Sequence, residues 1–148
     1  QIDVLRTLIS PYFETDPFSM DIQARDTQHN FSIQDALNSK AFEGRLNQNI
    51  KLYFGKESHP KTTKSLGDFI TNKKTNAFGK SDQKACEWAF LSALLTLEER
   101  AVAEGGNAVV NIRSFYKQNE VSSSIEFECH TGLVVAGVAL KGTIVRIE

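Results

Sequence analysis

The stretch that decides the fold is residues 81–106, which read SDQKACEWAFLSALLTLEERAVAEGG. Ser81 followed by Asp82 is typical of a helix start, because the serine hydroxyl can accept a free backbone N–H and the acidic side chain suits the positive helix end. Gly105 and Gly106 indicate the helix end, since glycine adopts the left-handed conformation there without a Cβ clash. We therefore predict one long helix over residues 82–104.

Between residues 88 and 97 this helix is apolar nearly all round, because only Ser92 and Thr96 interrupt the apolar run. A helix that lies on one sheet needs a single apolar stripe. Either the N-terminal half of the chain or a second subunit must therefore cover the other face of the helix. The second alternative predicts self-assembly.

Strand patterns follow the helix. The segment 107–117 alternates apolar and polar residues, and the segment 121–129 places its cysteine on the apolar, covered face. The segment 133–147 is β-like throughout, with a change of phase near Lys141-Gly142 that indicates a bulge. We predict an α+β fold, with one long helix packed on a small antiparallel sheet of strands 107–117, 121–129 and 133–147 and an added strand at 49–54.

The first half of the chain carries weaker patterns. Residues 32–37 read as a short capped helical turn, and residues 56–80, rich in Lys, Thr, Asn and Gly, are interpreted as loop. We predict a single domain over residues 25–148, with its core at 81–148 and an irregular N-terminal extension. Residues 1–24 form a poorly assignable tail, and the sequence leaves open whether they are native or vector-derived.

The composition excludes two classes of partner. The formal net charge of -1 lacks the cationic excess that non-specific nucleic-acid binding requires. The longest apolar stretch, residues 133–140, has the length of a strand and is too short for a membrane span. We expect no nucleic-acid partner and no membrane span.

Gly79-Lys80-Ser81 matches the end of a phosphate-binding loop, G-x-x-x-x-G-K-[ST]. The first glycine of that motif would stand at position 74, which is Lys74, so we predict no nucleotide hydrolysis. Lys73, Lys74 and Lys80, close to the helix start at Ser81, form a candidate anion-binding site. The alternative is a solvated lysine-rich loop in which Ser81 is an ordinary helix cap.

Cys86 and Cys129 are the two cysteines of the chain. They can form one disulfide or remain two buried thiols. A bridge needs Cα atoms about 6 Å apart, which requires residues 114–130 to form a hairpin that projects past the helix end at which Cys86 lies. We favour the bridge. We predict neither a metal nor a cofactor, because Cys129 and His130 point to opposite faces of a strand and no C-x-x-C spacing occurs.

Mixed polar and aromatic side chains gather on one face of the predicted strands. A candidate partner surface consists of Arg113, Phe115, Lys117, Glu128 and His130. Aromatic, arginine and histidine side chains on an exposed sheet can form a binding site, whereas the alternative is an ordinary soluble sheet face. No catalytic constellation stands out in the sequence, so we predict a non-enzymatic protein.

Four stretches carry a resemblance to known proteins: 71–81 (TNKKTNAFGKS), 86–91 (CEWAFL), 104–112 (EGGNAVVNI) and 128–130 (ECH). From about Arg25 onward the chain resembles a group of small secreted proteobacterial proteins that are commonly labelled "excinuclease ATPase subunit". The resemblance implies secretion and no established activity. The label itself is discarded, because the phosphate loop lacks its first glycine.

A more distant resemblance covers residues 86–147, where a helix is followed by Asn107-Ala108-Val109 and then by Cys129 with the stretch 137–140 (GVAL). This part is similar to the Rcs envelope-stress lipoprotein sensor and to YbjQ-like proteins. The resemblance implies a helix packed on a small antiparallel sheet, and ring assembly in YbjQ-like members. It also supports the Cys86–Cys129 bridge, whereas the sensor's second cysteine pair is replaced by Ser114 and Val135.

Together these observations predict a periplasmic or secreted protein without enzymatic activity, which binds a partner in the cell envelope or assembles with itself. The alternative prediction is a protein that binds a small ligand, an anion or a metal ion.

Overall fold

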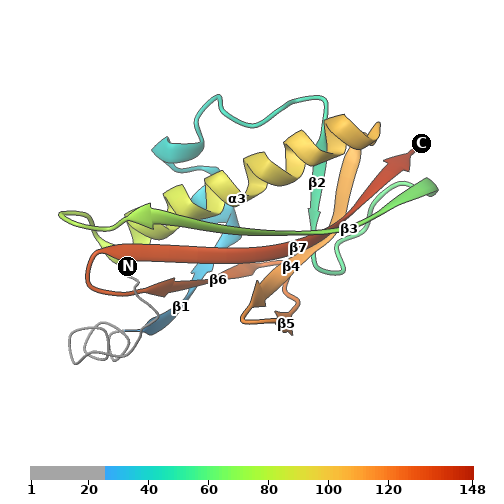
Figure 1. Cartoon of the computed structure of the whole chain (residues 1–148). Coiled ribbons are helices and arrows are strands. Elements are labelled where there is room, and N and C mark those ends of the chain that lie inside the picture. The colour runs from blue at the N-terminus through green and yellow to red at the C-terminus, as the bar shows by residue number, and fades with distance from the viewer. Residues whose placement is uncertain (1–25) are drawn as a thin grey trace.

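The computed structural model describes residues 26–148, so the predicted tail 1–24 lies outside the described residues. Its long helix, α3 (Asp82–Glu104), lies against a seven-stranded sheet (Figure 1). A short helix, α2 (Ile33–Leu37), and a 3-10 turn, η1 (Lys40–Phe42), precede it in the chain. The predicted α+β class is thus confirmed.

The sheet contains β1 (Thr27–Ser32), β2 (Lys51–Phe54), β3 (Thr62–Asn76), β4 (Ala108–Tyr116), β5 (Asn119–Val121), β6 (Glu126–Thr131) and β7 (Val135–Ile147). The strand order is β1-β6-β7-β4-β2, with β3 pairing with β7 and β5 pairing with β4. The predicted strands pair antiparallel as expected, β4 with β7 and β6 with β7, but the whole sheet is mixed, because the added strand β2 runs parallel to β4. The connection from β2 to β4 passes through β3 and α3, which is long enough for a parallel crossover.

The ends of α3 lie where the sequence places them. The Ser81 hydroxyl accepts the backbone N–H of Lys84 at 3.1 Å, and Gly105 closes the helix at φ 82°. The helical turn predicted at 32–37 is also confirmed, since the Ser32 hydroxyl accepts the backbone N–H of Asp35 at 3.0 Å. Within residues 26–148, no helix combines the length and hydropathy of a membrane span.

The first half of the chain is not an irregular extension, because it supplies three strands of the sheet. Residues 62–76, predicted as loop, form the fifteen-residue strand β3, which runs antiparallel along nearly the whole of β7. Residues 27–32 form β1, which pairs with β6. Both strands are dominated by polar side chains and bury few of them, so the apolar alternation that marks a half-buried strand is missing.

The last strand, predicted at 133–147, is confirmed over Val135–Ile147 as β7. The bulge predicted near Lys141-Gly142 lies at that level of the sheet, but its extra residue is in the facing strand β4, between Val110 and Arg113. The pairing of β3 with β7 is also irregular, between Thr62 and Lys64 and between Ser65 and Asp68. The bulged segment of β4 contains Asn111 at φ 51°. β7 itself stays regular while both neighbours adapt to it.

The segment 121–129, predicted as one strand, was also placed wrongly. A turn at Lys117 and Gln118, both with positive φ, joins β4 to the short β5, and β6 begins only at Glu126. Between these strands the side chain of Ile125 is 71% exposed rather than covered. The chain therefore leaves β4 after the hairpin and continues as β6 along β1.

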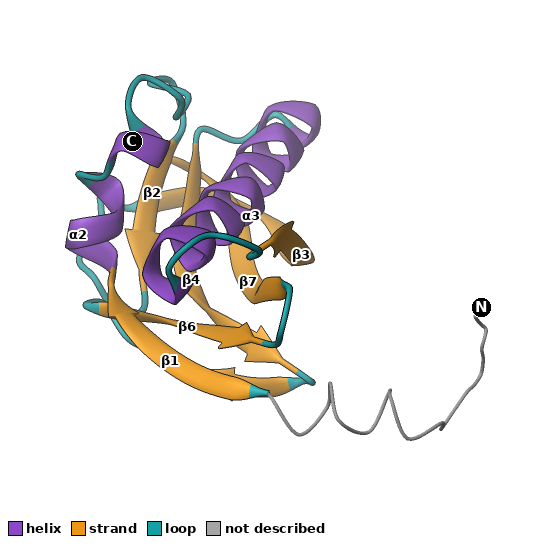
Figure 2. Ribbon diagram, turned by 90° about the vertical axis from the view of Figure 1, so that its left-hand side faces the viewer, coloured by secondary structure: helices purple, strands orange, loops and turns teal. Residues whose placement is uncertain are grey.

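The apolar middle of α3 is covered within the chain. The sheet curls around one side of the helix, and the segment from α2 to β2 crosses another side (Figure 2). On that side the rings of Phe42 and Phe54 pack against Phe90, with ring centroids 5.8 and 6.0 Å away. The observation that predicted self-assembly is thus explained by packing inside one subunit.

Candidate functional site

Cys86 of α3 and Cys129 of β6 form a disulfide, as favoured from the sequence. Their Cα atoms are 5.9 Å apart, and both residues are fully buried. The route to this pairing differs from the predicted hairpin 114–130, because the hairpin ends at Val121. Cys129 reaches the helix start within β6, whose last two residues pair with the beginning of β7.

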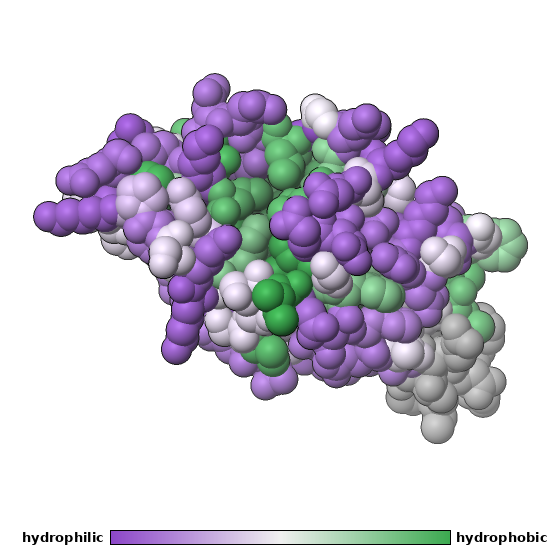
Figure 3. Space-filling view, turned by 180° about the vertical axis from the view of Figure 1, so that it is seen from behind, coloured by the Kyte–Doolittle hydropathy of each residue, from purple (hydrophilic) through white to green (hydrophobic). Residues whose placement is uncertain are grey.

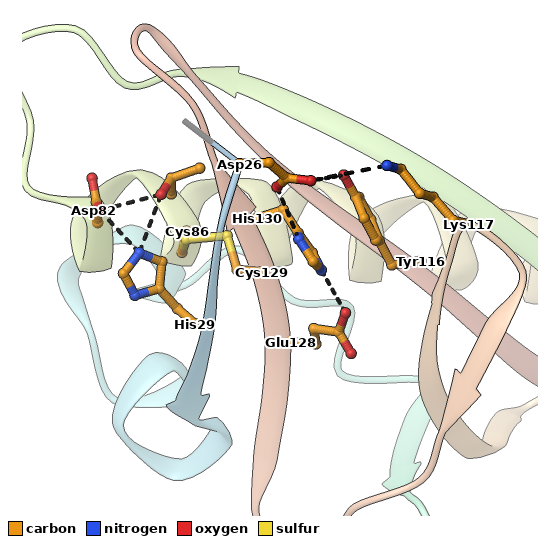
Figure 4. A network of polar contacts seen from close by, with 10 residues as sticks. Asp26, His29, Asp82, Cys86, Tyr116, Lys117, Glu128, Cys129 and His130 are labelled. Carbon is orange, nitrogen blue, oxygen red and sulfur yellow. Dashed lines mark hydrogen bonds and ion pairs between the residues drawn. A yellow bond between two sulfur atoms is a disulfide. The ribbon is translucent and has the colours of Figure 1, made fainter. Parts of the chain in front are cut away.

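β6 divides its side chains between two environments, since successive residues of a strand point to opposite faces. Phe127, Cys129 and Thr131 are buried on the side of α3, where the Phe127 ring stacks on Phe90 at a centroid distance of 3.9 Å. Glu128 and His130 point to the outer side of the sheet. Figure 4 shows the disulfide and the outer polar groups on either side of this strand.

His130 is the centre of the outer group. Its Nδ1 lies 3.1 Å from Oδ1 of Asp26, and its Nε2 lies 2.5 Å from Oε2 of Glu128 (Figure 4). Its ring stacks on Tyr116 at a centroid distance of 3.4 Å. Ionised carboxylates only accept hydrogen bonds, so both contacts of His130 are complete when both ring nitrogens carry hydrogen.

Tyr116 ties the end of β4 to the same group. Its hydroxyl donates to Oδ2 of Asp26 at 3.2 Å, and Nζ of Lys117 lies 3.9 Å from the same oxygen. Desolvation raises the pKa of Tyr116, and the nearby charge of Asp26 and the hydrogen bond to it raise this pKa further. The phenol therefore keeps its proton at neutral pH and remains a hydrogen-bond donor.

An open trough of roughly 490 Å³ lies next to this group and is called the outer trough here. Because Gly137 carries no side chain, it leaves the trough open at the start of β7. Lys74 reaches the trough from β3, and Lys117 reaches it from the β4–β5 turn. The lining residues are Asp26, Lys74, Tyr116, Lys117, His130, Thr131, Gly132, Val135 and Gly137.

The predicted partner surface is only partly assembled on one face. Lys117 and His130 line the outer trough, and Glu128 lies buried behind His130. Arg113 is buried, and its Nε lies 2.5 Å from Oε2 of Glu120. Its guanidinium group is therefore engaged in an ion pair within the chain. Phe115 lies under the ammonium group of Lys141, which is 4.9 Å from the ring centroid.

The residues of the predicted anion site do not converge on one point. Lys73 and Lys74 are neighbours on β3 and so point to opposite faces of the sheet. Nζ of Lys80 donates to the backbone carbonyl of Asn76 at 3.0 Å, and Ser81 serves as the cap of α3. Of this set, Lys74 alone lines the outer trough.

A second histidine lies on the helix side of the sheet. Nε2 of His29 is 2.9 Å from Oδ2 of Asp82 and 3.1 Å from the hydroxyl oxygen of Thr131. His29 is opposite Cys129 in the β1–β6 register, so it covers the disulfide at the edge of the sheet. This contact joins β1, β6 and the first turn of α3.

Two members of the outer group, Asp26 and Tyr116, were not predicted from the sequence. Asp26 lies 104 positions from His130 and directly precedes β1, which was not predicted as a strand, whereas Tyr116 at the end of β4 contacts His130 of β6. Within residues 26–148, no three His, Cys, Asp or Glu side chains form a group that could hold a metal ion.

The chemistry of the outer group favours binding over proton transfer. Both ring nitrogens of His130 already face carboxylate oxygens, so neither is directed at a substrate in the outer trough. A general base must reach the proton that it abstracts. The lysines of the trough, by contrast, present ammonium groups to solvent.

The chain matches no known family model, no curated protein and no solved structure.

Proposed function

We propose that this protein is a non-enzymatic interaction module of the periplasm or the extracellular space, and that its outer trough binds an acidic segment of a partner protein. The observation that carries this proposal is the convergence of Lys74 and Lys117, from two different elements, on one trough beside the stacked rings of Tyr116 and His130. Tyrosine is enriched at protein interfaces, and exposed ammonium groups attract a partner of complementary charge.

Asp26 offsets the charge of Lys117, with which it forms an ion pair, but it forms no ion pair with Lys74. Oδ1 faces His130 and Oδ2 accepts from Tyr116, with Lys117 at 3.9 Å. Lys74 forms no ion pair with any residue in the described range. A carboxylate group entering the trough would therefore find an unneutralised ammonium group within it.

The proposed compartment is supported by the disulfide, since structural disulfides persist in oxidising environments such as the periplasm. Alkylation of the chain unfolded in denaturant without reductant, followed by mass measurement, tests this, because unfolding exposes any free thiol. We expect both cysteines to be protected. If both cysteines of the chain isolated from cells react with the alkylating reagent, the result would contradict the proposed location.

We also propose that the core is related to the Rcs sensor and YbjQ-like proteins. A long helix on a sheet and a bridge from the helix start to a strand support this relation. The parallel strand β2 and the long strand β3 are additions that the resemblance did not imply.

The binding proposal is tested by NMR titration of the ¹⁵N-labelled full chain with a synthetic peptide that contains four consecutive glutamates. We expect shifts of the backbone amides of Lys117, Gly132 and Gly137, and weaker binding as salt is added, because the attraction is between exposed charges. Shifts confined to other parts of the sheet, or no shifts at low salt, would refute the proposal.

Charge reversal at both lysines, Lys74→Glu with Lys117→Glu, is expected to abolish these shifts. The matched control reverses two exposed lysines of the β2–β3 loop, Lys56→Glu with Lys61→Glu, and leaves the net charge equal to that of the first variant. If both double variants lose binding equally, the trough is not the site and only the overall charge matters.

A further inference from the structure

The second surface lies at the end of the molecule where α3 begins. Large apolar side chains are exposed there on two neighbouring turns, with Phe78 75% exposed, Leu133 50% and Val134 52%. We call these three residues the apolar tip. Figure 3 shows apolar atoms at the corresponding end of the molecule.

The two turns of the apolar tip are joined by hydrogen bonds. The backbone N–H of Ala77 donates to the carbonyl of Val134 at 2.8 Å, and that of Gly132 donates to the carbonyl of Val135 at 2.8 Å. The backbone N–H of Phe78 donates to the Asn76 side chain, also at 2.8 Å. The exposed side chains are thus presented by an ordered framework of turns.

Positive charge accompanies the apolar tip. Between residues 73 and 84 the chain carries four lysines and a single carboxylate, Asp82, which is already in contact with His29. Lys80 is two residues from Phe78, and Lys84 lies exposed in the first turn of α3. Apolar side chains next to lysines are the combination that binds the interface of an anionic bilayer.

We propose that the apolar tip inserts into the headgroup region of a membrane that contains anionic lipids, while the neighbouring lysines contact the lipid phosphates. Two features favour a bilayer over a second copy of the chain. The tip is formed by two turns that project from the end of the sheet (Figure 1), and two such ends would bring their lysines together. A negatively charged lipid surface is complementary to both the shape and the charge. This inference does not depend on the outer trough.

The test is flotation of the full chain with vesicles of two compositions. One contains phosphatidylcholine only, and the other contains seven parts phosphatidylcholine to three parts phosphatidylglycerol. We expect binding to the second and not to the first. The double variant Phe78→Ser/Leu133→Ser should bind the anionic vesicles at least about tenfold more weakly, because two apolar side chains no longer leave water.

Lys80→Glu is expected to weaken binding at least about fivefold, which is the contribution of one basic residue near an anionic surface. Ile125→Ser is the control for the loss of exposed apolar side chains. Ile125 is 71% exposed and directly precedes β6, at the end of that strand away from the apolar tip. Binding that survives the double variant would overturn insertion, as would equal binding to both vesicles or no binding by the unaltered chain. A dimer that the double variant dissociates, measured by light scattering, would assign the tip to self-association and also overturn the proposal.

Discussion

The six residues of β6 alternate between two faces of the sheet, and the two faces have different surroundings. On the helix side, Cys129 and Phe127 are buried in a dry core with a disulfide and stacked rings. On the outer side, Glu128 and His130 form a polar group next to an open trough. We infer that the inward residues of β6 stabilise the folded state and that its outward residues contribute to partner binding. Both functions are thus carried by alternate residues of one strand.

The disulfide should give the largest effect on the stability side of this comparison. Replacing Cys86 and Cys129 together by alanine removes a cross-link that spans 43 residues, which costs about 4 kcal/mol of unfolding free energy in the chain-entropy model. Urea unfolding measures this loss. Binding of the acidic peptide by the folded variant should be unchanged, and a loss below about 1 kcal/mol would refute the stabilising role.

Two glycines of β7 sharpen the comparison further, because one faces each side. A Cβ at Gly142 would lie 2.7 Å from Cγ1 of Val109, so Gly142→Ala should overpack the core and cost about 1–3 kcal/mol. At Gly137 the nearest atom, Cγ of Lys74, would be 3.6 Å away. Gly137→Ala should therefore leave the unfolding free energy within about 0.5 kcal/mol and instead change peptide binding. Equal destabilisation by both would remove the distinction between the two sides.

Replacing Ser81 tests whether this residue at the start of α3 stabilises the helix or binds an anion. As a helix cap, Ser81→Ala should cost about 1 kcal/mol of unfolding free energy and leave acidic-peptide binding intact. The control is Ser92→Ala, in the middle of the same helix, where no capping bond is lost. A Ser81 variant with full stability but weaker anion binding would show that the capping interpretation is wrong.

The smallest expected effect concerns Glu98, a buried carboxylate on the helix side. Burial raises the pKa of Glu98, the hydrogen bonds from the backbone N–H of Asn47 partly oppose this, and the charge of Glu99 adds to the increase. The folded state therefore binds this proton more tightly than the unfolded state. Its contribution to stability is present below the unfolded pKa of about 4.3 and is lost as pH rises through the raised folded pKa.

Glu98→Gln should remove this fall in stability, which is measured by unfolding at a series of pH values from 4 upward. The exposed residue Glu126 provides the control as Glu126→Gln, because it lies on β6 away from this pocket. A Glu98→Gln profile that runs parallel to that of the unaltered chain would contradict the assigned direction of the pKa change.

How far the sequence predicts this fold depends on how much apolar surface an element buries. The helix at 82–104 was predicted with its ends, because capping and a C-terminal glycine mark it and its middle is buried. β4 was predicted from its alternation of apolar and polar residues, and β7 from its unbroken β-like run of apolar residues. β1 and β3 were missed, because each has one unpaired edge and few buried side chains, so threonine content was the only signal for β3.

The candidate site was predictable where its residues lie on predicted strands or, for Lys74, in the lysine-rich segment that was predicted as loop. Lys117, Glu128 and His130 were identified from their place on a polar strand face. Asp26 and Tyr116 were not, since their contact with His130 depends on β1 pairing with β6 and on the β4–β5 hairpin leaning onto β6. No local pattern encodes a contact over 104 positions in the chain.

The pairing scheme of the sheet has a consequence for how the chain folds. Every strand of the first half pairs with a strand of the second half: β1 with β6, β2 with β4 and β3 with β7. Strands that lie before the helix thus have no ladder to join until the last third of the polypeptide has been synthesised. Such high contact order slows folding to about milliseconds or longer. The sheet of a nascent chain can therefore form only after the second half of the chain has been synthesised.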